Sequence, residues 1–159
     1  MNRTYPRVLQ PIPLILVLLT ALACPAFSED IQTLIKDAEG GNPKAQFNLG
    51  LAYGNGQGVS KDYAESMKWY RKAAEQGHAA AQCILGIYYS DGNVVPQDYL
   101  LAYFWASLAA TRNTGDVNNR CANSSYMDYA GMAARQLTPE QLTKAQQMTR
   151  EWEAKHPRK

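Results

Sequence analysis

The sequence is poor in the side chains that metal sites and nucleophilic catalysis require. Its 159 residues include two histidines, His78 and His156, and neither has a cysteine or the other histidine near enough to suggest a metal site. No two cysteines have the Cys-x-x-Cys spacing of a zinc site. Ser107, Ser124 and Ser125 have no evident base to activate them. We therefore expect no metal, no cofactor and no enzymatic activity.

An excess of positive charge is also lacking. The chain has 16 Lys and Arg residues against 14 Asp and Glu residues, and two of the basic ones, Arg3 and Arg7, lie in the first 28 residues, where no acid occurs. The rest of the chain is formally neutral. A neutral chain does not offer the basic surface with which proteins bind nucleic acid, so we expect no nucleic-acid partner.

Long hydrophobic runs are absent except near the N-terminus. The run at residues 14–19 (LILVLL) is well short of the roughly 20 apolar residues that span a bilayer. It follows basic residues and precedes small ones, the layout of a secretory signal peptide over residues 1–28. Cleavage after Ala23 and cleavage after Ser28 both remain open, and an uncleaved anchor is the alternative. We expect an exported protein, either periplasmic or secreted.

In an exported chain the three cysteines could undergo different modifications. The stretch Ala21-Leu22-Ala23-Cys24 loosely resembles a bacterial lipoprotein box, whose cysteine takes a lipid. A lipidated Cys24 would make the chain an outer-membrane lipoprotein, and we expect membrane contact only in that case. Cys83 and Cys121 remain as an even pair in an oxidising compartment, so they are disulfide candidates. The alternative is a buried apolar Cys83 and a free Cys121.

What the sequence does contain is an internal repeat. When the chain is shifted by 36 positions it matches itself over a whole unit, which indicates a repeat architecture. The matching pairs include Ala45-Gln46 with Ala81-Gln82, Leu49-Gly50 with Leu85-Gly86, Tyr53 with Tyr89, Gly56 with Gly92, Asp62-Tyr63 with Asp98-Tyr99, and Trp69 with Trp105. A partial repeat at 29–42 therefore precedes full repeats at about 43–78 and 79–111.

Each unit predicts two helices. The first helix of the first unit spans 43–54, where apolar residues recur at the three- and four-residue spacing of one helical face, and Asn42 is suited to cap it. The second begins at Asp62, and Glu65 three residues later predicts a capping box. The other repeat helices are expected at 30–39, 79–90 and 98–111.

Residues 112–159 are predicted to form two helices that cap the array. One is expected at about 120–136, and Thr138 and Gln141 predict a second capping box at the start of the other. Repeat arrays need such terminal helices to cover an exposed apolar end. The predicted fold class is therefore all-α.

The loop at residues 54–58 (GNGQG) raises the question of a phosphate site, because it is rich in glycine and precedes a helix. A phosphate loop of the Walker type needs a lysine and a hydroxyl residue directly after its last glycine, and here Val59 follows Gly58. The second copy of the loop keeps only one of the three glycines, Gly92. We interpret the loop as a turn between two helices.

The repeated motif A-Q-x-x-L-G-x-x-Y-x-x-G-x-x-V-x-x-D-Y-x-x-x-x-x-W-x-x-x-A-A resembles the Sel-one-like repeat, a relative of the tetratricopeptide repeats. The resemblance covers residues 29–111, and the segment that begins at Leu137 is similar to the tail of small bacterial members. It implies an α-α superhelix, or solenoid, with a curved groove. It also implies an adaptor or protein-protein interaction module in the bacterial envelope, whose partner is a protein or peptide.

Two other functions are alternatives. A cysteine-rich branch of the family is associated with binding penicillin-like molecules, which suggests a hydrolase or binder of cell-wall or β-lactam compounds. That branch carries paired cysteines in each repeat, and this chain does not. A structural envelope lipoprotein is the second alternative.

The groove of related superhelical repeats takes side chains from the first helix of each unit, at positions outside the packing face. By this analogy the candidate binding residues are Lys44, Phe47, Leu51, Cys83, Ile87 and Asp91.

Overall fold

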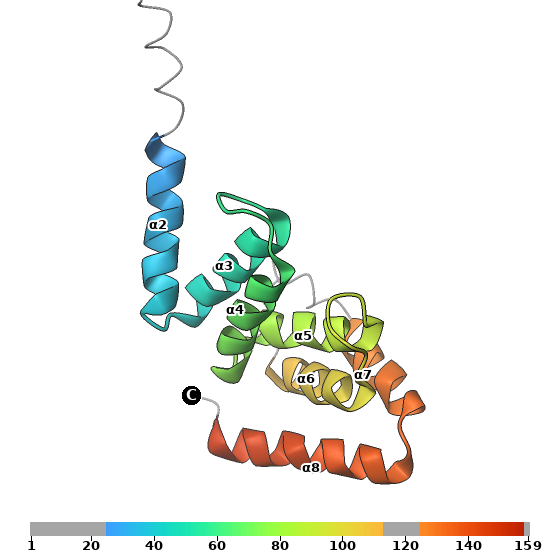
Figure 1. Ribbon diagram of the computed structural model, residues 1–159. Coiled ribbons are helices and arrows are strands. Elements are labelled where there is room, and N and C mark those ends of the chain that lie inside the picture. The colour runs from blue at the N-terminus through green and yellow to red at the C-terminus, as the bar shows by residue number, and fades with distance from the viewer. Residues whose placement is uncertain (1–24, 113–124, 158–159) are drawn as a thin grey trace, which may run out of the picture.

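The chain forms an all-α superhelix in which each helix packs beside the next, except that the last helix packs on the one two before it (Figure 1). The computed structural model describes residues 25–112 and 125–157. Within these ranges there are helices and turns and no strands. The helices are α2 (Pro25–Glu39), α3 (Pro43–Asn55), α4 (Tyr63–Glu75), α5 (Ala79–Asp91), α6 (Tyr99–Arg112), α7 (Ser125–Gln136) and α8 (Pro139–Lys155).

The helices largely match the sequence prediction, and the differences lie at their ends. Helix α2 begins at Pro25, five residues before the predicted start, so Ser28 lies inside it. The predicted segment 120–124 of the next-to-last helix falls outside the described residues, as do Ala23 and Cys24. None of the described helices combines the length and apolar character needed to cross a membrane.

Local capping fixes where the repeat helices begin. The Asn42 side chain accepts hydrogen bonds from the amides of Lys44 and Ala45, at 3.0 and 3.1 Å, and so satisfies two donors that the first turn of α3 leaves unpaired. The Asp62 side chain does the same for Ala64 and Glu65 at the start of α4. Both caps were expected from the sequence.

The predicted capping box at Asp62 is wrong in its second half. The Asp62 amide donates to the Tyr53 carbonyl at 2.9 Å, so it has no need of the Glu65 side chain. The Glu65 carboxylate instead pairs with Lys68 one turn later in α4. The box predicted at the start of α8 is confirmed, because Thr138 and Gln141 exchange both hydrogen bonds.

The glycine-rich loop between α3 and α4 is a helix-ending turn. Gly56 adopts the left-handed conformation, with φ 74°, at the C-cap of α3, and its amide donates to the Ala52 carbonyl. The Gln57 amide donates to the same carbonyl at 2.9 Å. Gly92 repeats this geometry after α5, with φ 70°. These amides are consumed within the turn, so they are not free to bind phosphate.

The glutamine of the repeated Ala-Gln motif links each repeat to the helix that precedes it. The Gln46 amide nitrogen donates to the Ala38 carbonyl near the end of α2, at 3.1 Å. Thirty-six residues later, Gln82 donates to the Ala74 carbonyl near the end of α4, at 3.0 Å. Both glutamines are buried, so each bond satisfies polar groups that would otherwise cost free energy. The repeated glutamine therefore sets how each first helix packs on the helix before it.

Small residues let the two helices of each repeat approach closely. A methyl group built on Gly50 would lie 2.7 Å from the Tyr70 ring of α4, and one built on Gly86 would lie 3.1 Å from the Ala106 amide nitrogen of α6. Both distances are shorter than a normal contact between heavy atoms. The glycines at these equivalent positions therefore determine how closely α3 packs on α4 and α5 on α6.

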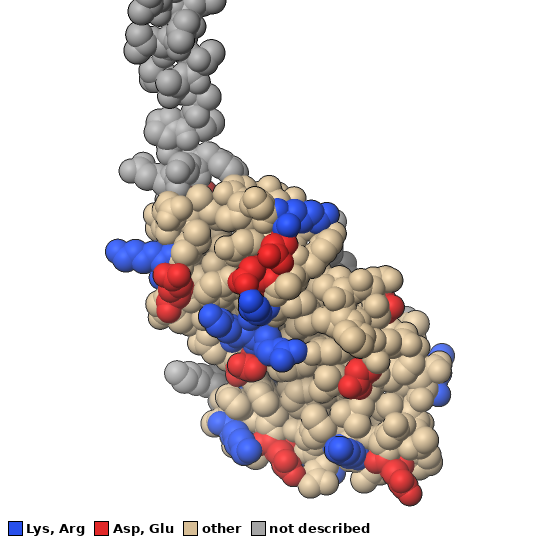
Figure 2. Space-filling view, viewed as in Figure 1, with Lys and Arg blue, Asp and Glu red and all other residues tan. Residues whose placement is uncertain are grey.

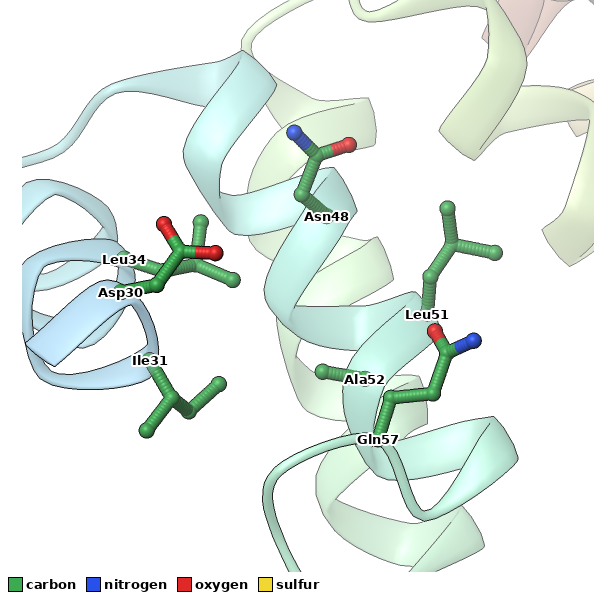
Figure 3. A pocket seen from close by; sticks show the side chains of 7 residues that line it. All are labelled: Asp30, Ile31, Leu34, Asn48, Leu51, Ala52 and Gln57. Atoms are coloured by element: carbon green, nitrogen blue, oxygen red, sulfur yellow. The ribbon is translucent and has the colours of Figure 1, made fainter. Parts of the chain in front are cut away.

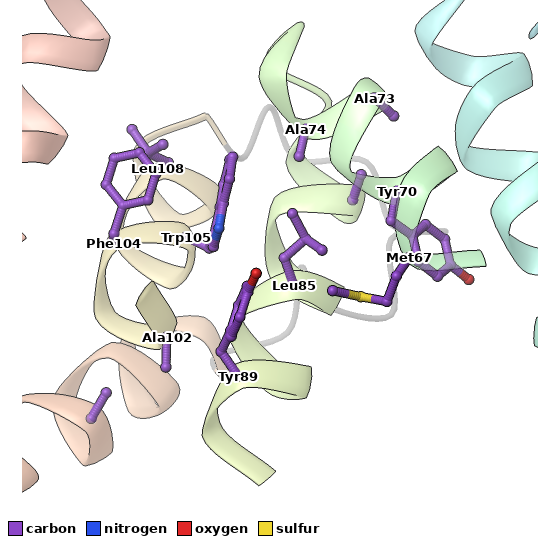
Figure 4. Packing of buried hydrophobic residues seen from close by; sticks show 12 residues of the cluster. Met67, Tyr70, Ala73, Ala74, Leu85, Tyr89, Ala102, Phe104, Trp105 and Leu108 are labelled. Atoms are coloured by element: carbon purple, nitrogen blue, oxygen red, sulfur yellow. The ribbon is translucent and has the colours of Figure 1, made fainter. Parts of the chain in front are cut away.

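The main core lies between α4, α5 and α6 (Figure 4). Leu85 and Leu108 are fully buried there, and Trp105 packs edge-on against Phe104 with ring centroids 4.8 Å apart. A smaller cluster joins α2 to α3 around Leu49. The buried residues of the main core are Met67, Tyr70, Ala73, Ala74, Ala81, Leu85, Tyr89, Ala102, Phe104, Trp105, Leu108 and Ala133.

Helix α8 packs against α6, and its C-terminal end lies beside the turn between α4 and α5 (Figure 1). The Arg112 guanidinium, at the end of α6, lies 4.5 Å from the centre of the Trp152 ring and donates a hydrogen bond to the His156 carbonyl. Trp152 also stacks on the His156 ring, with centroids 4.1 Å apart. The C-terminal helix is thus held by a cation–π contact as well as by apolar packing.

Candidate functional site

Two hollows lie next to each other on the surface formed by the first half of the array, and Leu51 belongs to both. The α2–α3 hollow has a volume of about 390 Å³. Figure 3 shows Ile31 and Leu34 of α2 facing α3, with Leu51 at the far edge of α3. The residues that line this hollow are Asp30, Ile31, Leu34, Asn48, Leu51, Ala52 and Gln57.

The α3–α5 hollow lies on the other side of Leu51 and has a volume of about 310 Å³. Its apolar floor comes from Leu51 of α3 and from Ile84 and Ile87 of α5, all half-buried. Tyrosines and one lysine surround this floor. The full set of lining residues is Leu51, Gly54, Asn55, Lys61, Tyr63, Tyr70, Ile84, Ile87 and Tyr88.

Two tyrosines of the α3–α5 hollow, Tyr70 and Tyr88, have a raised pKa. Burial raises the pKa of Tyr70 to about 12, and the nearby Tyr88 adds to the rise. Burial also raises the pKa of Tyr88, with a further rise from Tyr63 and an opposing effect from Lys61. A neutral phenol can donate a hydrogen bond to a ligand. The hollow therefore offers hydroxyl donors above an apolar floor.

Tyr63 is the most exposed aromatic group in this hollow. Its side chain is 48% exposed, whereas most of the other large apolar side chains in the described residues are covered. The Lys61 ammonium lies 4.7 Å from the centre of its ring, in a cation–π contact. Tyrosine is enriched among the residues that dominate binding energy at interfaces. Tyr63 and Lys61 thus form an accessible rim.

The six predicted groove residues have different surroundings. Leu51 lines both hollows and Ile87 lines the α3–α5 hollow, whereas Lys44 and Asp91 are exposed and line neither. Phe47 is half-buried, stacked on His78 with ring centroids 4.7 Å apart and tilted against Tyr70 at 5.7 Å. Phe47 therefore packs against the main core and, like Lys44 and Asp91, lines neither hollow.

Cys83 is buried, 3% exposed, in a small cluster with Ala109. It is disulfide-bonded in the structure. Cys121 lies outside the described residues, so the Cys83–Cys121 pairing stays a prediction. Because Cys83 is buried and bonded, its sulfur is not a contact for a groove ligand.

Several lining residues were not anticipated from the sequence. Ile31 and Leu34 lie on the helix of the partial repeat, and Lys61 and Tyr63 lie where α4 begins, rather than on the first helix of a unit. The analogy with related repeats considers first helices alone, so it misses them. The available signal in the sequence was the aromatic Tyr63 two residues after Lys61, at the start of a predicted second helix.

Other types of site find little support in the described part of the chain. No group of three His, Cys, Asp or Glu side chains there could hold a metal ion. On the face seen in Figure 2, acidic and basic side chains are interspersed among a larger uncharged area. The two hollows are therefore the candidate binding features considered below.

The two repeat units match a known family. Residues 43–78 and residues 79–113 each match the family model for the Sel1 repeat. Among curated proteins, no significant match is found. The repeat boundaries coincide with the helix pairs α3–α4 and α5–α6.

Solved structures of repeat proteins are similar to the chain. One is a protective antigen present in uropathogenic Escherichia coli strains, displaying an SLR fold, at 33% identity and a TM-score of 0.67 over 88% of this chain and 28% of that one. Another is a Sel1 repeat protein from Oxalobacter formigenes, at 36% identity and a TM-score of 0.52 over 69% of this chain and 48% of that one. The chain spans less than half the length of either structure. The chain thus carries two tandem Sel1 repeats within an all-α superhelix.

Proposed function

We propose that the chain is an exported adaptor that binds an extended peptide, or an extended segment of another protein, in the groove made by the two hollows. Sel1 repeat proteins are in general protein-interaction modules. The observation that carries the proposal is Leu51, an apolar and half-buried side chain shared by two adjoining hollows. A continuous surface of this kind suits a partner that lies across several helices.

The groove is suited to binding because its walls are fixed before a ligand arrives. Leu49 is fully buried on α3 and holds this helix against α2. The Ser66 hydroxyl of α4 donates to the Gly50 carbonyl of α3 at 2.7 Å, and Tyr70 packs against the same glycine. A preformed surface loses little conformational freedom on binding, which favours affinity.

Recognition would combine an apolar floor with hydroxyl donors at the rim. Leu51, Ile84 and Ile87 offer apolar area, whose burial contributes about 25 cal/mol per Å². Tyr63 and Tyr88 offer aromatic area together with hydroxyl groups. This combination is typical of the central residues of protein interfaces.

Export is the second part of the proposal, and it rests on the signal-peptide pattern of residues 1–28. The periplasm or the exterior of the cell is the expected location. Mass spectrometry of the mature N-terminus tests this directly. A chain that begins at Glu29, or at a Cys24 without lipid, supports a released exported adaptor, and a diacylated Cys24 makes it an outer-membrane lipoprotein. An intact Met1 contradicts cleavage, and protease accessibility in intact spheroplasts then distinguishes an uncleaved exported anchor from a chain that is not exported.

The binding proposal is tested by crosslinking in the cell envelope, followed by identification of the captured proteins. Leu51→Arg places a charge in the middle of the groove, and Tyr63→Ala removes the exposed aromatic ring. Met132→Arg is the matched control, because Met132 is equally exposed, at 48%, but lies on α7 away from both hollows. All three variants are first checked for an unchanged melting temperature.

We expect the wild type and Met132→Arg to capture the same specific proteins, and Leu51→Arg and Tyr63→Ala to lose them. Equal capture by all four chains would show that the groove is not the binding surface. Absence of any protein enriched over an unrelated exported protein would contradict the adaptor function itself.

A further inference from the structure

The two hollows carry opposite charges, and this gives the groove a direction. Lys61 is the charged residue among those that line the α3–α5 hollow, and Asp30 is the charged residue among those that line the α2–α3 hollow. Leu51 lies between them, because it belongs to both hollows. The order along the groove is therefore cation, apolar group, anion.

We infer that the groove takes a peptide in which an apolar side chain stands between an acidic and a basic residue, with the apolar side chain on Leu51, the acid beside Lys61 and the base beside Asp30. This inference rests on the proposed peptide-binding function and adds the chemistry of the partner. The other possible occupants, a purely apolar segment or one of a single charge, are outcomes of the test below.

The Lys61 end is suited to a carboxylate. Its ammonium is exposed and lies over the Tyr63 ring rather than beside an acid. Tyr88 lines the same hollow and keeps its phenolic proton at neutral pH, so its hydroxyl can donate to a carboxylate oxygen. An ammonium and a hydroxyl that lie close together are both hydrogen-bond donors, so a carboxylate can accept from both, whereas a cation cannot.

The Asp30 end is suited to a cation. Asp30 is exposed on α2, and its neighbours in the α2–α3 hollow include the amides of Asn48 and Gln57, which offer carbonyl oxygens as further acceptors. Within the described residues, Asp30 and Lys61 form no ion pair, and the ion pair of Glu65 with Lys68 lies elsewhere, on α4. Both charges therefore remain to be complemented by a ligand.

We expect Lys61 and Asp30 to determine the direction of the bound peptide more than its affinity. Ion pairs at a solvent-exposed rim change affinity by only about two- to five-fold each. Complementary charges fix the register and direction of a bound segment and penalise the reverse one. The apolar contact with Leu51 then supplies affinity, while Lys61 and Asp30 select the order of the charges.

The test is a selection from a random dodecapeptide display library on the exported chain purified from the envelope of expressing cells. Peptides that also bind Leu51→Arg are removed, so that only groove-dependent sequences remain. The same selection is run on the charge-exchanged variant Asp30→Lys/Lys61→Glu, whose fold is checked by its melting temperature. Both exchanged positions are exposed, so little loss of stability is expected.

From the wild type we expect groove-dependent peptides with an acid on one side of an apolar residue and a base on the other, in one preferred direction along the peptide. From the charge-exchanged variant we expect the reversed order. Replacing the acid of a selected peptide with glutamine should weaken binding two- to five-fold on the wild type and not at all on Lys61→Gln.

The outcomes separate this inference from the proposed function. Groove-dependent peptides without a charge pattern, or with a pattern that does not reverse in the exchanged variant, would overturn the inference and leave peptide binding in place. Enrichment of peptides with a single charge would also overturn it. If no peptide depends on Leu51, the proposed function fails together with the inference.

Discussion

Replacing Gly50 with alanine adds one methyl group where α3 meets α4, and it tests the packing between the two helices of a repeat. The added carbon would lie 2.7 Å from two carbons of the Tyr70 ring. That is about 1 Å closer than an ordinary contact between carbon atoms. The ring cannot retreat easily, because Tyr70 is only 2% exposed and packs against Phe47 and Tyr88. The strain must therefore be taken up by the helices themselves.

The size of the effect follows from two opposing terms. Overpacking a filled core costs about 1–3 kcal/mol, and an immobile aromatic ring places this site in the upper half of that range. Replacing glycine with alanine inside a helix gains about 1 kcal/mol from helix propensity. We expect a net loss of about 1–2 kcal/mol in the free energy of unfolding, measured by urea denaturation followed by circular dichroism.

Gly131→Ala is the matched control, since it makes the same chemical change within α7, where nothing lies within 4 Å of the added methyl group. This variant should be more stable than the wild type by about 0.5–1 kcal/mol. In a Tyr70→Ala background, Gly50→Ala should no longer destabilise, giving a coupling energy of about 2 kcal/mol. The reasoning is refuted if Gly50→Ala is as stable as the wild type or if its cost persists without the Tyr70 ring.

Three further predictions follow from the caps, the buried phenol and the docked last helix. Asp62→Ala and Asp98→Ala should each lower the free energy of unfolding, measured by urea denaturation, by about 1 kcal/mol, because each carboxylate caps the second helix of its repeat. Unequal losses would contradict the equivalence of the two caps. Because the pKa of Tyr70 is raised to about 12, the folded state keeps a proton that the unfolded chain releases above pH 10. The contribution of this phenol to the free energy of unfolding is therefore complete below pH 10 and falls by up to about 2 kcal/mol as the pH rises to about 12. Tyr70→Phe should lose less stability over that range, and an equal loss would show that the phenol does not titrate late. Arg112→Ala removes the cation over Trp152, so it should lower the free energy of unfolding by about 2 kcal/mol and speed amide hydrogen exchange in α8. An unchanged exchange rate in α8 would contradict docking of this helix through Arg112.

Features that depend on a few neighbouring residues could be predicted from the sequence. Asn42, Asp62 and Thr138 cap their helices because a short polar side chain reaches backbone amides two or three residues away, which is a local property. The 36-residue offset likewise reveals the repeat without reference to the fold. The glycine turn was correctly interpreted because its second copy keeps only the residue that ends the helix.

The lining of the two hollows could be predicted only in part, because it depends on how helices from different units are rotated against one another. Leu51 and Ile87, which were expected from the position of the first helices, do line a hollow, and their role in binding stays a prediction. Tyr63 belongs to the start of a second helix and reaches the same hollow only through tertiary packing. The cap at Asp62 shows the same effect on a smaller scale. Its amide is taken by the Tyr53 carbonyl of the preceding helix, a long-range bond that the local capping-box pattern does not contain.

The glutamine bonds between repeats have a consequence for how the protein unfolds. If α3 opened by itself, the Gln46 amide and the Ala38 carbonyl would both lose a buried partner, and Gln82 and Ala74 stand in the same relation one unit later. In repeat arrays, the stability of the whole is approximately the sum of unit terms and terms between neighbours. Strong neighbour terms make units unfold together. We therefore expect this array to melt as one cooperative unit, so that a ligand bound in the two hollows would also stabilise the helices at the other end.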